Sequence, residues 1–204
     1  MSIKEDVADY YSKKVIEYGA RPRGVDWSSE SGQVLRFDQL SKIIDLDNEF
    51  SVNDIGCGYG AYLDYLCEKY EHFDYQGVDI SNEMISLAEQ QHKNLLNASF
   101  LCSSNPTRIA TYTVSSGIFN VKLGYSDAEW LQYIKQVIKA MNASSSKGFA
   151  FNCLTKYSDR EKMQGRLFYG DPGLFFDWCK ENFSKHVALL HDYDLYEFTI
   201  LVRK

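Results

Sequence analysis

The chain has 204 residues, of which 45% are hydrophobic and 25% are charged, and its formal net charge at pH 7 is −6. Such a chain can bury one sizeable core, so we expect a single domain over residues 1–204. The acidic balance disfavours nucleic acid as a partner, because phosphate binding needs clustered Lys and Arg side chains.

The N-terminus and the cysteines indicate the compartment. The first residues lack the apolar core of a signal peptide, and no apolar run is long enough to span a membrane. The five cysteines are odd in number and include no Cys-x-x-Cys pair, which is typical of reduced thiols within a core. We therefore expect a cytoplasmic protein without a membrane segment, and the oligomeric state is left open.

Apolar residues at spacings of three and four predict a short amphipathic helix over residues 5–18. Gly19, Pro22 and Gly24 then interrupt the pattern, and the next helix is expected from Val34 to Ile44. We interpret residues 1–31 as an N-terminal helical cap on a core formed by residues 32–204.

From Ser51 onwards, strand and helix patterns alternate. Strands are expected at 51–55, 74–79, 98–102, 112–119, 148–154, 186–191 and 196–202. Helices are expected near 60–70, 82–93, 127–141 and 172–183, with a polar turn at 142–147 and an irregular stretch at 155–170. The last two strands are too close in sequence for a crossover helix, so they must be antiparallel. The pattern predicts an α/β fold with a seven-stranded, mostly parallel sheet, an antiparallel last strand and helices on both faces.

Three glycines at alternate positions follow the first expected strand, and an acidic residue ends the second. Gly56, Gly58 and Gly60 leave this loop free of side chains, so a ligand can approach the backbone and the N-terminus of the next helix. Asp79 lies about twenty residues further on, a spacing at which its carboxylate can bind both hydroxyls of a ribose. Asp54 would repel a pyrophosphate and suits a cation. The stretch therefore predicts a site for a cationic nucleoside without phosphates.

The motif D-x-G-x-G-x-G at residues 54–60 resembles the first motif of class I S-adenosylmethionine-dependent methyltransferases. The acidic end of the second strand, the helix opening at 82–85 and the antiparallel strand pair extend the resemblance over the chain from residue 33. It implies a Rossmann-like fold, S-adenosylmethionine (SAM) as cofactor and S-adenosylhomocysteine (SAH) as product. It also implies that Asp54 faces the methionine moiety and that Asp79 binds the ribose. The other implied cofactor-binding residues are Gly56, Gly58, Gly60, Ile80, Met84, Ser103 and Gly117.

Methyl transfer requires acceptor, methyl group and sulfur to be held in line, and a general base helps when the acceptor is a hydroxyl. His191 is expected on the same rim as the glycine loop and is a candidate base, together with Tyr169. The acceptor is expected to contact the cap, which resembles the N-terminal lid of small-molecule methyltransferases, and three loops of the core. The candidate contacts are Tyr11, Trp27, Phe119, Asn120, Tyr157 and Tyr193.

The resemblance thus implies a methyltransferase that acts on a small or carrier-bound molecule, with an oxygen of a sugar-like or carboxylic metabolite as the expected acceptor. Which residue reads the adenine is left open among residues 102–105, and phenols also fit as acceptors. No His, Cys and Asp cluster has the spacing of a metal site, so no metal is expected. The alternatives are a scaffold or sensor that binds SAM or SAH without turnover, and an NAD-dependent oxidoreductase, which Asp54 and the glycine spacing disfavour.

Overall fold

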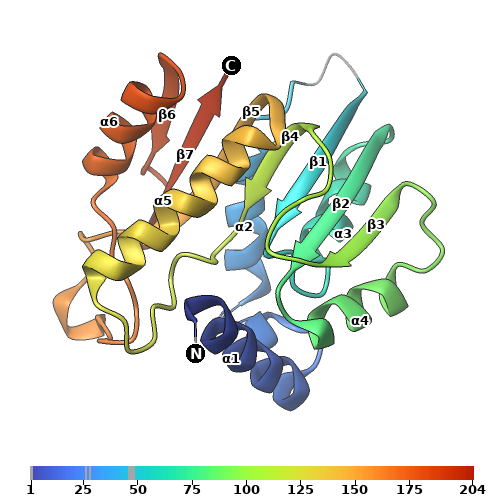
Figure 1. The fold of residues 1–204 in the computed structure, drawn as a ribbon, viewed down its shortest axis with the longest axis horizontal. Coiled ribbons are helices and arrows are strands. Elements are labelled where there is room, and N and C mark those ends of the chain that lie inside the picture. Colours follow the sequence, from blue (N-terminus) through green and yellow to red (C-terminus); the bar gives the residue numbers. More distant parts are fainter. Residues whose placement is uncertain (1, 26, 28, 46–48) are drawn as a thin grey trace.

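A seven-stranded sheet forms the middle of the protein (Figure 1). The computed structural model describes residues 2–25, 27, 29–45 and 49–204. The strands are β1 (Phe50–Ile55), β2 (Phe73–Asp79), β3 (Ala98–Cys102), β4 (Ala110–Ser115), β5 (Ser145–Leu154), β6 (His186–Leu190) and β7 (Glu197–Arg203). The helices are α1 (Ile3–Tyr18), α2 (Glu30–Ser41), α3 (Ala61–Lys69), α4 (Asn82–Gln91), α5 (Asp127–Ala143) and α6 (Pro172–Asn182), with short 3-10 helices at Pro22–Val25 and Arg160–Lys162.

The strands lie in the order β3-β2-β1-β4-β5-β7-β6. The pairs among β1 to β5 are parallel, whereas β7 lies antiparallel between β5 and β6. The predicted fold class and the predicted antiparallel pairing of the last two strands are confirmed. The strand order reverses between β1 and β4, and ligands of such sheets bind beyond the carboxyl ends of the strands at this point.

Helices pack on both faces of the sheet and build two cores. Phe37 of α2 and Leu63 of α3 are buried on one face, and Trp130 of α5 and Phe175 of α6 are buried on the other. Serine N-caps mark the starts of α1, α2, α4 and α5. At α5, for example, the Ser126 side chain accepts the backbone N–H at the third helical position. None of the helices in the described ranges is long and apolar enough to cross a bilayer.

Three sequence expectations are wrong in detail. The expected strand 112–119 ends at Ser115, because Gly117 adopts a φ of 77° and turns the chain. The expected polar turn 142–147 is instead the end of α5 and the start of β5, where the buried Ser145 hydroxyl donates to the carbonyl oxygen of Met141 at 2.9 Å. The cysteines are all free thiols, but Cys67 and Cys102 are exposed and lie outside the core.

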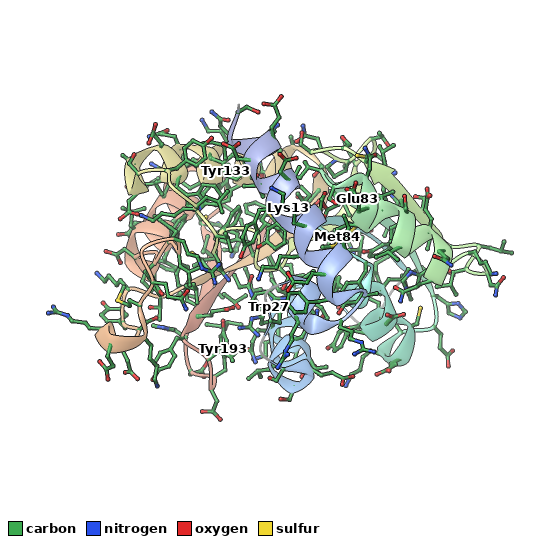
Figure 2. The ribbon with its side chains drawn as sticks, turned by 90° about the horizontal axis from the view of Figure 1, so that it is seen from below. Lys13, Trp27, Glu83, Met84, Tyr133 and Tyr193 are labelled. Carbon is green, nitrogen blue, oxygen red and sulfur yellow. The ribbon has the colours of Figure 1, made fainter. Side chains whose placement is uncertain are left out.

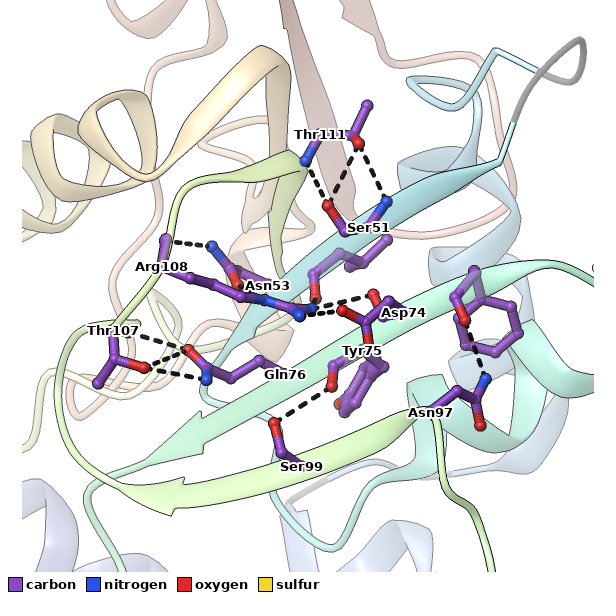
Figure 3. A network of polar contacts seen from close by, with 12 residues as sticks. Ser51, Asn53, Asp74, Tyr75, Gln76, Asn97, Ser99, Thr107, Arg108 and Thr111 are labelled. Atoms are coloured by element: carbon purple, nitrogen blue, oxygen red, sulfur yellow. Dashed lines mark hydrogen bonds and ion pairs between the residues drawn. The ribbon is translucent and has the colours of Figure 1, made fainter.

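Between β3 and β4 the chain crosses the sheet as an irregular segment, residues 103–109, without a helix (Figure 1). Polar side chains of the sheet hold this segment (Figure 3). The backbone N–H of Thr107 donates to Oε1 of Gln76 at 2.9 Å, and Nε of Arg108 donates to Oδ1 of Asn53 at 3.2 Å. Arg108 also pairs with Asp74 and donates to carbonyl oxygens of β1 and β2. Its guanidinium therefore joins β1, β2 and the crossing segment.

We expect Arg108→Met to lower the free energy of unfolding by about 1–3 kcal/mol, because Asn53 and the strand carbonyls lose a charged donor. Urea denaturation followed by circular dichroism measures the change. The matched control is Lys147→Met, at an exposed position of β5, where we expect a change within about 0.5 kcal/mol. Equal losses in the two variants would contradict the role assigned to Arg108.

Candidate functional site

A cavity of about 300 Å³ opens at the carboxyl ends of β1, β2 and β4, next to the point where the strand order reverses. Figure 2 shows α1 across this side of the molecule, with Trp27, Met84 and Tyr133 around it. The volume is at the lower end of the range for small-molecule sites, roughly 300–1,000 Å³. The cavity is lined by Lys4, Val7, Tyr11, Val25, Trp27, Ile55, Gly56, Gly58, Asp79, Ile80, Met84, Ser103, Ser104, Asn105, Ser116, Gly117, Ile118, Tyr133, Gln136 and Val137.

The first two glycines of the motif lie at the cavity, as the sequence predicts. Gly56 and Gly58 adopt positive φ values of 76° and 57°, a region that favours glycine. A Cβ atom at Gly56 would lie 2.1 Å from Cγ2 of Ile118, so a side chain there would displace the loop after β4. A Cβ atom at Gly58 would lie 3.2 Å from Cγ1 of Val25 in the cap. Both glycines therefore keep the backbone of the loop accessible and allow its neighbours to approach.

The third glycine has a different environment from the expected one. Gly60 does not line the cavity, and a Cβ atom there would lie 2.6 Å from Cε1 of His92. His92 is buried, with Nε2 2.9 Å from Oδ1 of Asp64 and Nδ1 2.8 Å from the carbonyl oxygen of Ala88. The bond to Asp64 raises the pKa of His92. Gly60 thus allows the end of α4 to pack against the start of α3, and its predicted contact with the cofactor has no support in this placement.

Asp79 stands at the end of β2 and presents its carboxylate at the cavity wall. Its Oδ2 accepts the N–H of Gly58 and its Oδ1 accepts the N–H of Ser81, each at 2.9 Å. Burial raises the pKa of Asp79, and these N–H bonds partly offset that effect. The carboxylate therefore ties the glycine loop to the N-terminus of α4, next to Ile80 and Met84 in the cavity lining.

Asp54 is buried and does not line the cavity. Its Oδ2 accepts the hydroxyl hydrogen of Tyr75 at 2.8 Å. Burial raises the pKa of Asp54 to about 7, against the opposing effect of the Tyr75 bond. Side chains alternate along a strand, so Asp54 shares the face of Val52, which belongs to the core on the α2 and α3 side. The expectation that Asp54 faces the methionine moiety is therefore corrected: it can affect a ligand only across the loop.

The loop after β4 supplies an unpaired polar group. The Ser116 hydroxyl oxygen is buried and has no hydrogen-bond partner among the described residues. Buried hydroxyls are almost always paired, so an unpaired one in a cavity lining indicates a polar ligand atom. The neighbouring Gly117 is held by its N–H, which donates to Oδ1 of Asn152 at 2.7 Å. The Trp27 indole lies against Gly117, where a Cβ atom would be 2.2 Å from Cζ2 of the ring.

The helix α1 closes the cavity and brings cap residues to it. Val7 and Tyr11 are in the lining, as is Lys4, whose Nζ donates to Oγ of Ser104 at 2.9 Å. Tyr11 and Trp27 thus lie at the cavity, where the sequence places them. The contact between Lys4 and Ser104 joins the N-terminus of α1 to the segment after β3, which also contributes the predicted Ser103.

Phe119 and Asn120 were expected to contact the acceptor, but the structure places them in the interior. Phe119 is fully buried, and its carbonyl oxygen accepts the indole N–H of Trp130 at 2.7 Å. Oδ1 of Asn120 accepts the N–H of Leu154 at 3.0 Å. Neither residue lines the cavity, because the turn at Gly117 directs the chain towards α5 and β5. Their placement explains packing and gives no support to an acceptor contact.

His191 lies on the expected rim but far from the cavity along the sheet. It follows β6, which is the edge strand and is three strands from β4, roughly 14 Å at the usual strand spacing. The imidazole is exposed, and its centroid is 5.8 Å from that of the Tyr157 ring. Neither residue lines the cavity. The predicted role of His191 as the base therefore has no support in the geometry.

Tyr169 and Tyr193 also lie outside the cavity lining. The Tyr169 hydroxyl accepts the N–H of Gln164 within its own loop at 3.0 Å. The Tyr193 hydroxyl oxygen is 2.9 Å from Oγ1 of Thr199 on β7. Both phenols are engaged in contacts that hold loops, so the structure supports neither the catalytic role expected for Tyr169 nor the acceptor contact expected for Tyr193.

Sequence reasoning missed one wall of the cavity. Tyr133, Gln136 and Val137 lie on one side of α5, at spacings of three and four. The spacing is visible in the sequence, but the residues alone do not show which side of α5 faces the cavity. Ser116 was also missed, because a lone serine at a strand end carries no sequence signal.

The cavity residues fit SAM, which carries a sulfonium, an amino acid group and a ribose. Gly56 and Gly58 expose backbone, Asp79 offers a carboxylate, and the unpaired Ser116 hydroxyl offers a polar contact. Ile80 and Met84 offer apolar surface. Within the described ranges, no group of three or more His, Cys, Asp or Glu side chains is arranged to hold a metal ion.

A family model described as Methyltransferase domain matches residues 52–143. Rv1506c from Mycobacterium tuberculosis (strain ATCC 25618 / H37Rv), named as a methyltransferase, is 52% identical over 163 residues, which cover 80% of this chain and 98% of that protein. Magnesium protoporphyrin IX methyltransferase from Synechocystis PCC 6803 with bound SAM superposes with a TM-score of 0.72 at 15% identity, covering 100% of this chain and 98% of the other. The N-methyltransferase NodS from Bradyrhizobium japonicum WM9 with SAH gives 0.67 at 13% identity, covering 97% of each chain.

The two solved structures show a shared fold, and the relative that is 52% identical over nearly its whole length shows the family. The glycine loop, its acidic partner on β2 and the antiparallel β7 are the features on which the sequence resemblance was based. The chain therefore belongs to the class I S-adenosylmethionine-dependent methyltransferases.

Proposed function

We propose that this methyltransferase acts on an oxygen of a small or carrier-bound acceptor, and that a carboxylate is the acceptor that its site fits best. SAM supplies an electrophilic methyl group on a sulfonium. The residues proposed to hold it are Asp79 for the ribose, Gly56, Gly58 and Ser116 for the amino acid end, and Ile80 and Met84 for the adenine. These roles rest on the lining of the cavity and on the unpaired Ser116 hydroxyl.

The observation that favours a carboxylate is the character of the ionisable groups in the cavity lining. An alcohol must lose a proton during transfer and benefits from a base, whereas a carboxylate is already ionised at pH 7. Among the described lining residues, Asp79 accepts two backbone N–H bonds, and burial raises the pKa of Tyr133 to about 12. The described lining contains no histidine. Lys4 is its one cationic side chain and would attract an anion.

A sugar-like hydroxyl is the second candidate, favoured by the hydroxyl and amide groups of Ser104, Asn105 and Gln136 in the lining. The structural neighbours do not decide between acceptors, since one is named for magnesium protoporphyrin IX and another is an N-methyltransferase. The two candidates differ in their need for a base.

We expect methyl transfer to carboxylic acids at a rate that is nearly constant between pH 6 and pH 9, because the acceptor needs no deprotonation in this range. The measurement is release of SAH across a panel of carboxylic acids, glycosides and phenols, with the methylated product identified by mass spectrometry. Methyl transfer only to glycosides, with a rate that rises with pH, would show that the acceptor group is a hydroxyl and not a carboxylate. If no compound of the panel led to release of SAH, the interpretation as a scaffold without turnover would be favoured.

Lys4→Met provides a second check on the same proposal. It should raise KM for a carboxylate acceptor about two- to fivefold with little change in kcat, as expected for a solvent-exposed charge pair. Lys13→Met is the matched control, because Lys13 belongs to the same helix but does not line the cavity. Equal KM values for the two variants would contradict a role for Lys4 in attracting the acceptor.

A further inference from the structure

A closed ring of five residues connects the cap to the loop after β4. The N–H of Gly117 donates to Oδ1 of Asn152 at 2.7 Å, and Nδ2 of Asn152 donates to Oε2 of Glu197 at 2.9 Å. Arg36 donates from Nε to both oxygens of Glu197, at 3.0 and 2.9 Å, and from Nη2 to Oε1 at 2.7 Å. The guanidinium carbon of Arg36 is 3.8 Å from the centroid of the Trp27 ring. Trp27 lies against Gly117, which completes the ring.

The five members come from five separate parts of the chain. Trp27 precedes α2, Arg36 belongs to α2, Glu197 begins β7, Asn152 belongs to β5 and Gly117 follows β4. The exposed fractions of Arg36, Asn152 and Glu197 are 9%, 0% and 1%. Only Trp27 and Gly117 line the cavity. The three polar members therefore stand behind the cavity wall and can act on it only through these two residues.

The chemistry of the ring fits a positional role better than a purely stabilising one. A buried ion pair adds little net stability compared with apolar side chains of the same volume, because desolvation offsets the attraction. It does fix geometry, since the planar fork of Arg36 bonds both oxygens of Glu197 and the carbonyl oxygen of Gly32 at 2.7 Å. A guanidinium held in one plane can in turn orient the indole stacked on it.

We propose that Arg36 and Glu197 are positioning residues for methyl transfer, which hold the Trp27 indole against Gly117 and so fix the cap side of the cofactor cavity. The ring makes the segment before α2 and the loop after β4 a single unit. Loss of the Arg36 fork frees the indole, and the backbone next to the unpaired Ser116 hydroxyl then loses its support. The binding part of the test rests on the proposed cofactor site, whereas the spectroscopic part does not.

The spectroscopic test uses acrylamide quenching of Trp27 fluorescence in the ligand-free protein. The signal of Trp27 is isolated from the other two tryptophans by subtracting the same protein carrying Trp27→Phe. Arg36→Met combined with Glu197→Gln removes both charges and leaves neither unpaired. We expect this pair of substitutions to raise the quenching constant of Trp27 at least about twofold, because the indole loses its stacked partner. An unchanged constant would overturn the proposal.

The binding test is a double-mutant cycle with SAH in calorimetry. We expect Arg36→Met with Glu197→Gln to raise the Kd of SAH about tenfold when Trp27 is present. In a chain that already carries Trp27→Ala, the same two substitutions should raise the Kd by less than about twofold. If the changes in Kd caused by the ion-pair substitutions and by Trp27→Ala simply multiplied, the ion pair would not act through Trp27. This result would overturn the proposal. If the wild-type chain bound no SAH, the proposed cofactor site would fail, and the quenching measurement would still decide the role of the ring.

Two further variants keep the experiment interpretable. Lys156→Met breaks the half-exposed ion pair with Asp171, outside the cavity lining, and should leave both the quenching constant and the SAH affinity at the wild-type values. If the combined substitution does not fold, Arg36→Lys replaces it, because it retains the charge but lacks the planar fork. An indole that stays protected in Arg36→Lys would contradict the proposed dependence on fork geometry.

Discussion

Asp79→Ala should weaken SAH binding by roughly 1–3 kcal/mol, which is about 5- to 150-fold, and should lower methyl transfer at limiting SAM at least as much. The carboxylate of Asp79 has two roles, one towards the ligand and one in the fold. It is the proposed partner of the ribose hydroxyls, and it accepts the N–H groups of Gly58 and Ser81 that fix the glycine loop and the start of α4. Truncation therefore removes a ligand contact and leaves two donors beside the cavity without their acceptor.

Calorimetry with SAH measures the change directly, and a comparison with Asp79→Asn separates the two effects. An amide oxygen can still accept one backbone N–H, so Asp79→Asn should retain more of the loop geometry while losing the charge. The matched control is Asp38→Asn, because Asp38 accepts the Tyr65 hydroxyl hydrogen at 2.7 Å away from the cavity lining. Unchanged SAH affinity in Asp79→Ala would mean that the ribose binds elsewhere.

The part of the site that could be predicted from sequence is the part built by local geometry. The loop with Gly56 and Gly58 comes directly after β1, and Asp79 ends β2. Because β1 and β2 are parallel neighbours, their carboxyl ends lie at the same edge of the sheet, which brings these residues together. Gly60 belongs to the same motif, yet it packs on His92, a residue more than thirty positions later. A pairwise contact of that kind is set by how two helices meet, which the motif does not encode.

Asp54 shows a limit of a different kind. The alternation of β1 places it with Phe50 and Val52 on the face that packs against α2 and α3, which the sequence pattern already contains. The family resemblance implies a ligand contact at Asp54, which this alternation does not support. The side-chain alternation was therefore the better guide to where this carboxyl points.

His191 lies on the expected rim, but the distance of its strand from the cavity along that rim could not be predicted. Its strand does run parallel to β5, but β7 lies between them, which moves the end of β6 to the edge of the sheet. Strand order is decided by long-range pairing and is not visible in the periodicity of any one strand. The ring of Trp27, Arg36, Asn152, Glu197 and Gly117 was invisible for the same reason, since its members are distant in sequence and carry no shared motif.

Asp54→Asn should remove a large pH dependence from the stability of the ligand-free protein. Burial raises the pKa of Asp54 to about 7, whereas in the unfolded chain this carboxyl titrates near its ordinary pKa of 3.8. Between these values the folded state binds one proton more than the unfolded state, so stability falls as pH rises. The contribution is fully present below the unfolded pKa and is lost as pH passes through about 7. Between pH 5 and pH 8 the loss amounts to about 2–3 kcal/mol.

Urea denaturation of the wild type and of Asp54→Asn at pH 5 and pH 8 measures this contribution. The wild type should lose about 2–3 kcal/mol more than the variant between the two values. Any decrease in the free energy of unfolding that remains in the variant comes from the titration of other groups. These include Asp79, whose pKa is also raised by burial. Equal pH slopes in the two proteins would show that Asp54 is already ionised in the folded state at pH 5.

Tyr75→Phe tests the cause of the Asp54 pKa without removing the carboxyl. The Tyr75 hydroxyl donates to Oδ2 of Asp54 at 2.8 Å and favours the ionised form, so its removal should raise the Asp54 pKa and move the loss of stability to higher pH. SAM should oppose this loss, because its positive sulfonium favours the ionised forms of Asp79, in the cavity wall, and of Asp54, across the glycine loop. SAH lacks that charge, so the stabilisation by SAM should grow more from pH 5 to pH 8 than the stabilisation by SAH. Equal growth for the two ligands would mean that the charge of the cofactor does not reach these carboxylates.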